Sequence, residues 1–181
     1  ILGEAGVGKS RLLYEFDRWL AGSNLSLAVF KGRASPQMAS LPYGVLRELL
    51  SYRLGLHSSD SLELTRHKLV DGLSAYLDEE SEMKAHFIGS MLGFDFTDSP
   101  HLLGVADDPR QLHTRARLYL THCLSTLAGR VPSVVMLDDL QWADEPSMDF
   151  ITHLLQECPS LPLLVICLAR PSLSERFTGW G

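Results

Sequence analysis

The chain has 181 residues, of which 45% are hydrophobic and 21% are charged, and its formal net charge is −6. This length allows one domain with a sizeable buried core, and the acidic balance argues against a surface that coats nucleic acid. The sequence has no apolar run of the ~20 residues that a membrane span needs and nothing that resembles a signal peptide, so we expect a cytoplasmic protein without a membrane partner.

A glycine-rich stretch opens the chain: residues 1–10 read ILGEAGVGKS, which contains the pattern G-x-x-x-x-G-K-S. Glycines permit the positive φ angles that turn successive N–H groups toward an anion, and the helix that follows adds the positive end of its dipole. Lys9 would bind the β- and γ-phosphates, and the Ser10 hydroxyl suits Mg²⁺. The alternatives are an ordinary glycine-rich turn and a dinucleotide loop, which lacks its third glycine because Arg11 stands there. The predicted nucleotide-contacting residues are Gly3, Glu4, Ala5, Gly6, Val7, Gly8, Lys9, Ser10 and Arg11.

The segment after this loop predicts an amphipathic helix over residues 9–21, with Gly22 as its C-cap. Residues 25–30 predict a strand, followed by a polar turn that begins with Lys31-Gly32-Arg33. Only two residues precede the loop, although such a loop normally follows a buried strand, so we expect the chain to be a fragment of a longer protein. Apolar residues at helical spacing form one broad face of the helix, which we expect in the core: Leu12, Leu13, Phe16, Trp19 and Leu20.

A long helical region comes next. Pro42 begins its first helix, and Asp60 and Glu63 have the spacing of a capping box for the second. A third, shorter helix carries the apolar residues of the range 83–92, and residues 94–108 predict a loop.

The second half of the chain alternates helices and apolar strands. Asp108 is a predicted N-cap for a helix that ends near residue 129, and Asp144 is a predicted N-cap for the next. Residues 134–137 and 163–169 are continuous apolar runs, typical of strands covered on both faces of a parallel sheet. The alternation predicts an α/β fold with right-handed crossovers.

Polar residues follow both apolar strands, at the edge where ligands of such sheets collect. Asp138 would hold Mg²⁺, through water, and Asp139 would polarise the attacking water. Arg170 would sense or stabilise the γ-phosphate. An acidic pair in a turn and a surface salt-bridge arginine are the ordinary alternatives.

Residues 134–144, VVMLDDLQWAD, resemble the extended Walker B motif of the signal-transduction ATPases with numerous domains (STAND), a group within the AAA+ ATPases. The nearest relatives in this resemblance are ATPase modules of large LuxR-type regulators and of class III adenylate cyclases. Residues 3–12 are similar to their Walker A motif, Leu41-Pro42-Tyr43 to their Pro-Tyr landmark, and residues 163–170 to their sensor 1 strand.

This resemblance implies a P-loop NTPase three-layer sandwich with a parallel sheet of order 5-1-4-3-2. The chain would supply the end of strand one and strands two to four, with strand five and the lid missing. It would form part of one ATPase domain: a Walker A unit at 1–31, a helical insertion at 40–106, and a Walker B and sensor 1 unit at 107–181.

The predicted catalytic residues are Lys9, Asp139 and Arg170, and the predicted metal ligands are Ser10 and Asp138. Two positions depart from the family pattern: Gln141 stands where many relatives have histidine, and Asp139 where many AAA+ motors have glutamate. The shorter carboxylate suits a slow switch better than a fast motor.

The sequence therefore predicts a module that binds ATP and Mg²⁺ and hydrolyses ATP slowly, as a nucleotide switch in a signalling or transcriptional regulator. The predicted partners are ATP and ADP, a second copy when ATP is bound, and a fused DNA-binding, cyclase or kinase effector outside this segment, with no nucleic acid bound by the segment itself. The alternatives are a small-molecule phosphotransferase, a ring-forming motor and a scaffold that binds ATP without hydrolysis.

Overall fold

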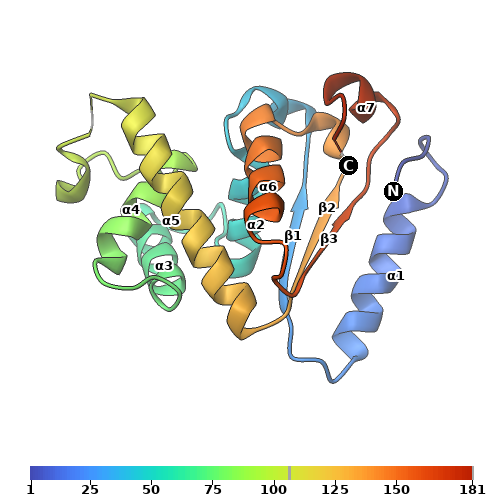
Figure 1. Cartoon of the computed structure of the whole chain (residues 1–181), viewed down its shortest axis with the longest axis horizontal. Helices are drawn as coiled ribbons and strands as arrows, with labels where there is room; N and C mark the ends of the chain where they lie inside the picture. Colours follow the sequence, from blue (N-terminus) through green and yellow to red (C-terminus); the bar gives the residue numbers. More distant parts are fainter. Residues whose placement is uncertain (106, 181) are drawn as a thin grey trace.

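A three-stranded parallel sheet is the centre of the computed structural model, which describes residues 1–105 and 107–180 (Figure 1). Its order is β1 (Ala28–Arg33), β2 (Ser133–Asp138), β3 (Leu163–Cys167). Beyond β3, Leu2 forms a parallel bridge with Ala169. The order is therefore Leu2, β3, β2, β1, which agrees with the 1-4-3-2 part of the predicted order and confirms the α/β fold class.

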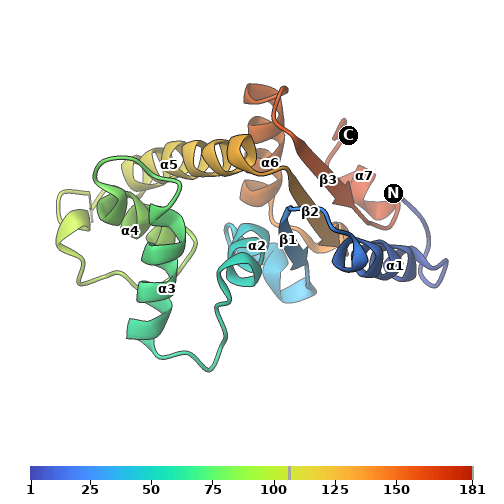
Figure 2. The ribbon, with the colours of Figure 1, turned by 90° about the horizontal axis from the view of Figure 1, so that it is seen from below.

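Helices cover both faces of this sheet (Figure 2). The α1 helix (Lys9–Gly22) lies on one face, where Leu20 packs with Val134 and Met136 of β2. The helices α2 (Gly44–Leu54), α5 (Pro109–Arg130) and α6 (Glu145–Glu157) lie on the other face, with Leu137 in their shared core. Successive β2 side chains point to opposite faces, so this apolar strand serves both layers.

The α1 helix is less buried than its sequence predicts. Leu20 is buried, but Leu12 is 56% exposed and Trp19 is 60% exposed. The prediction that the whole apolar stripe enters the core was wrong for these two residues. Helical spacing identifies the apolar face of α1 but not how much of it is covered. In this structure the sheet contacts that face only around Val134 and Met136.

Two further helices, α3 (Leu62–Ser74) and α4 (Ser81–Met91), lie away from the sheet, with α4 packed against α5 and α3 packed against α4 (Figures 1 and 2). In α4, a Cβ on Gly89 would lie 2.3 Å from the Phe96 ring, so glycine permits the close packing of the segment that follows. The predicted division into a Walker A unit, a helical insertion and a Walker B unit stays a prediction. Its boundaries at residues 106 and 181 lie outside the described residues.

Several element ends differ from the sequence predictions. The first strand begins and ends three residues later than predicted, because Gly32 and Arg33 continue to pair with Leu137 and Asp138. The N-cap of α3 is Ser61, whose hydroxyl accepts from the Leu64 N–H; Asp60 instead binds the His57 N–H and Lys68. The predicted loop over residues 94–108 contains a short 3-10 helix, Pro100–Leu102. A 3-10 turn at Pro36–Ser40, another at Leu140–Trp142 and the short α7 helix (Ser172–Arg176) complete the structure.

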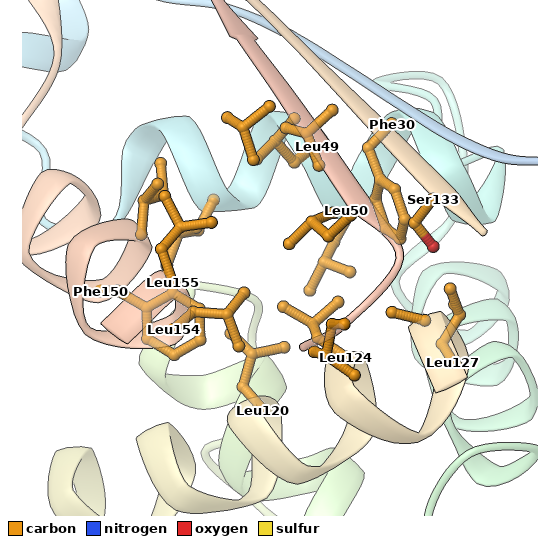
Figure 3. A pocket seen from close by; sticks show the side chains of 17 residues that line it. Phe30, Leu49, Leu50, Leu120, Leu124, Leu127, Ser133, Phe150, Leu154 and Leu155 are labelled. Atoms are coloured by element: carbon orange, nitrogen blue, oxygen red, sulfur yellow. The ribbon is translucent and has the colours of Figure 1, made fainter. Parts of the chain in front are cut away.

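An apolar cavity of about 50 Å³ lies between the sheet and helices α2, α5 and α6 (Figure 3). Its lining includes Phe30, Leu50 and Leu124, and Ser133 is the polar side chain among its lining residues. Without charged groups it has no means of binding phosphate, so it is a packing feature of the core. Among the described residues, we found no helix with the length and apolar character required to cross a membrane.

Candidate nucleotide-binding site

An open hollow of about 310 Å³ lies at the carboxyl edge of the sheet, at the N-terminus of α1. It brings together the N-terminal loop and the ends of β1, β2 and β3, although the loop is more than a hundred residues away from the ends of β2 and β3 in the sequence. Of the predicted site residues, Gly3, Glu4, Val7 and Asp138 are not part of its lining. The residues that line it are Ala5, Gly6, Gly8, Lys9, Ser10, Arg11, Arg33, Asp139 and Arg170.

The loop has the backbone form that binds an anion through N–H groups. Gly6 and Gly8 have φ angles of 84° and 94°, and no atom lies within 4 Å of a Cβ built on either. No side chain caps the first turn of α1, so its N-terminal N–H groups face the hollow without a side-chain acceptor. The Lys9 ammonium lies at the base of the loop, where it donates to the carbonyl oxygens of Gly3 at 2.6 Å and Glu4 at 2.8 Å.

Ser10 and Asp138 are in direct contact. The Ser10 hydroxyl donates to Asp138 Oδ2 at 2.9 Å, and Asp138 Oδ1 accepts the Asp139 N–H at 2.9 Å. A hydroxyl and a carboxylate beside a phosphate-binding loop are the hard oxygen donors that Mg²⁺ prefers. The residues present therefore fit this metal ion.

Asp139 is held on both carboxylate oxygens. Arg33 Nε donates to Oδ2 at 3.0 Å, Arg33 Nη2 forms an ion pair with the same oxygen at 2.9 Å, and Gln141 donates to Oδ1 at 2.9 Å. Partial burial acts to raise the pKa of this carboxyl, but the hydrogen bonds from Gln141 and Arg33 and the charges of Arg33 and Arg170 outweigh it, so the pKa is lowered. Its backbone is left-handed, with φ 57°, an uncommon conformation for aspartate that is frequent at functional sites.

Asp144 fixes the loop that follows Asp139. Its side chain is only 2% exposed and caps α6 by accepting the Ser147 N–H at 2.9 Å, as the sequence predicts. It also accepts the N–H groups of Tyr43 at 2.8 Å and Val45 at 3.1 Å. One buried carboxylate thus joins the loop after β2 to the turn at residues 41–43, where Tyr43 has a φ of 60°.

Arg170 lies beyond the end of β3. Its side chain lines the hollow, and its N–H donates to Gln141 Oε1 at 3.0 Å. In the part of the chain that the structure describes, no carboxylate lies within ion-pair distance of its guanidinium. This disfavours the alternative of an ordinary salt-bridge arginine.

Sequence reasoning missed Arg33 as a site residue. It was assigned to a polar turn because the strand was placed three residues too early. Its position opposite Asp138 in the β1–β2 register puts it at the ligand-binding edge of the sheet. A basic residue at the end of a strand was the available signal.

The model of one protein family, the AAA ATPase domain, matches residues 1–166. The chain belongs to this family. This AAA ATPase domain is 24% identical over 177 residues to the uncharacterized protein R02095 of Rhizobium meliloti (strain 1021). The aligned region includes 98% of this chain but only 16% of the length of that relative. No solved structure matches the chain. Family membership identifies a nucleotide-binding ATPase module, and the activity and partners of any longer protein are matters for proposal.

We expect Arg33→Ala to lower the free energy of unfolding by less than about 1 kcal/mol, because the Arg33 side chain is 73% exposed and solvent screens its ion pair. Since the pKa of Asp139 is lowered from its ordinary value of 3.8, the pair stabilises the fold above that pH. The contribution disappears as the pH falls through the lowered pKa. Urea unfolding of both proteins at about pH 7 and about pH 3 measures the change. If the wild type and Arg33→Ala differ in the free energy of unfolding by the same amount at both pH values, the ion pair contributes nothing to stability.

Proposed function

We propose that this AAA ATPase domain binds ATP and Mg²⁺ between the loop at residues 3–10 and Asp138, and hydrolyses ATP slowly as a nucleotide switch. The observation that supports this most is the contact of 2.9 Å between the Ser10 hydroxyl and the Asp138 carboxylate. It brings the loop of the first ten residues to the acidic end of β2, so that one triphosphate can reach both.

Each residue has one role in this proposal. The N–H groups from Gly3 to Arg11 bind phosphate oxygens, and Lys9 moves from the loop carbonyls to the β- and γ-phosphates. Ser10 and Asp138 hold Mg²⁺, Asp138 through water; the ion, when bound, offsets the negative charge of the phosphates. Asp139 orients the attacking water, and Arg170 binds the γ-phosphate.

Slow turnover is consistent with the surroundings of Asp139. Its carboxylate is already bound by Arg33 and Gln141, and the lowered pKa makes it a weaker base. An aspartate also extends less far from β2 than a glutamate. These features favour a switch over a fast motor.

The wider setting belongs to the same proposal. The resemblance to STAND ATPases supports a cytoplasmic signalling or transcriptional regulator with a fused effector, in which ATP favours self-association. ATP favours self-association only if the associated form of the domain makes better contacts with the γ-phosphate than the monomer does. The curated relative, of which this chain spans 16%, has ample length for further domains.

Single-turnover hydrolysis of ATP tests the catalytic assignment. Asp139→Asn is expected to slow the chemical step by about 10²–10⁴-fold, because the loss of general-base assistance has this size, with ATP affinity little changed. Asp149→Asn makes the same replacement at an exposed residue of α6 and should have no effect. Equal rates for Asp139→Asn and the wild type would rule out the hydrolytic role, and transfer of phosphate to a small acceptor would favour the phosphotransferase instead.

A further inference from the structure

Gln141 has an environment that is unusual for a glutamine. It lies in the 3-10 turn Leu140–Trp142, directly after the acidic pair, and the residue is buried, with a relative exposure of 3%. Burial of an amide is costly unless both of its ends are hydrogen-bonded. Both ends are hydrogen-bonded here, and each bond leads to a different part of the nucleotide-binding hollow.

The two bonds join Asp139 to Arg170. The Gln141 Nε2 group donates to Asp139 Oδ1 at 2.9 Å, and its Oε1 atom accepts the Arg170 N–H at 3.0 Å. The amide therefore spans the gap between the ends of β2 and β3. A change in the position of the Arg170 backbone must either move the Asp139 carboxylate or break one of these bonds.

The main chain at Gln141 is fixed as well. Arg176 of α7 donates to the Gln141 carbonyl oxygen and, at 3.0 Å, to the Ala143 carbonyl oxygen. The helix α7 begins two residues after Arg170. The turn that carries Gln141 is thus bound to the segment 170–176 twice, through the Arg170 N–H and through the Arg176 side chain.

We propose that Gln141 is a positioning residue that couples the catalytic carboxylate of Asp139 to Arg170. This inference rests on the proposed function, because it assigns regulation to the same site. When Arg170 engages the γ-phosphate, its N–H changes position relative to Oε1, and the amide transmits this change to Asp139 Oδ1. Placement of the water-orienting carboxylate then depends on whether a third phosphate is present. A displacement of about 1 Å in such a group is sufficient to change a rate about 100-fold.

Gln141→Met tests the coupling, because methionine has nearly the same length but makes neither hydrogen bond. We expect single-turnover hydrolysis to fall by about 10- to 100-fold, with the dissociation constant for ATP within about 3-fold of the wild type, since Gln141 does not line the hollow. Gln156→Met makes the same change at an exposed position of α6 and should match the wild type. If thermal melting shows that Gln141→Met is unfolded, Gln141→Leu replaces it: that variant also lacks both hydrogen bonds, in a smaller side chain, and the same fall in turnover is expected.

A double-mutant cycle separates positioning from a merely structural role. If Gln141 acts through Asp139, the methionine replacement should cause no further loss of turnover in Asp139→Asn. Equal fractional losses in the two backgrounds, or a Gln141 variant as active as Gln156→Met, would overturn the inference while the ATPase assignment stands. A wild-type protein without turnover would overturn the proposed function and this role with it.

Discussion

Lys9→Ala is expected to abolish the stabilisation of this domain by ATP. A ligand present at 100 times its dissociation constant stabilises a folded protein by about 2.7 kcal/mol, which is about 5–11 °C of melting temperature for a domain of this size. Lys9 is the lysine at the base of the loop, 2.6 Å from the Gly3 carbonyl oxygen, and it supplies the charge that the β- and γ-phosphates require. Without it we expect ATP affinity to fall by at least about 100-fold, equivalent to about 2.7 kcal/mol.

Thermal melting with and without ATP and Mg²⁺ measures this effect. Arg110→Ala removes a positive charge from an exposed residue at the start of α5 and should leave the ATP-dependent shift unchanged. Melting of Lys9→Ala without nucleotide gives the cost of the two loop hydrogen bonds separately. An ATP-dependent shift of wild-type size in Lys9→Ala would exclude the loop as the phosphate site.

Asp144→Ala is expected to have the largest effect on stability, a loss of about 3–7 kcal/mol. The change removes the N-cap of α6, worth about 1 kcal/mol, and leaves the N–H groups of Tyr43 and Val45 without their acceptor inside the protein. Each buried N–H left unsatisfied costs about 1–3 kcal/mol. Urea unfolding measures the loss, and the melting temperature should fall by more than about 6 °C.

Asp144→Asn provides the graded control. It keeps the oxygen that accepts from Tyr43 and Ser147 and replaces the one that accepts from Val45, so its loss should lie between those of the wild type and the alanine variant. Asp149→Ala, on the exposed face of the same helix, should change the free energy of unfolding by less than about 0.5 kcal/mol. If Asp144→Ala were as stable as Asp149→Ala, the buried carboxylate would not hold the two turns together.

Local chemistry predicted much of this fold. The caps at Asp108 and Asp144 are confirmed because a side-chain oxygen followed by a helical pattern acts within one turn. The apolar runs at β2 and β3 are confirmed as strands. Coverage on both faces is confirmed for β2 but was wrong for β3, where Leu164 is 49% exposed. The exposure of Leu12 and Trp19 was missed because an apolar face does not specify what covers it.

The candidate site was also predicted only as far as local sequence patterns allow. The loop, Asp139 and Arg170 line one hollow, as expected for residues at the carboxyl ends of parallel strands. The bonds of Asp139 to Arg33 and of Gln141 to Arg170 depend on the register between strands, which one sequence does not reveal. The buried Asp144 also joins the loop after β2 to the turn at residues 41–43, because it accepts the Tyr43 N–H.

The Mg²⁺ dependence of ATP binding tests most directly whether the loop binds the triphosphate of ATP while Asp138 binds its Mg²⁺ ion. ATP affinity would be measured with Mg²⁺ and with a chelator, in the wild type and in Asp138→Ala. We predict that Mg²⁺ tightens ATP binding to the wild type by at least about 10-fold, or 1.4 kcal/mol, and that Asp138→Ala loses this gain but keeps its affinity for ATP without metal. The same gain from Mg²⁺ in both proteins would contradict a metal held by Asp138 beside the nucleotide.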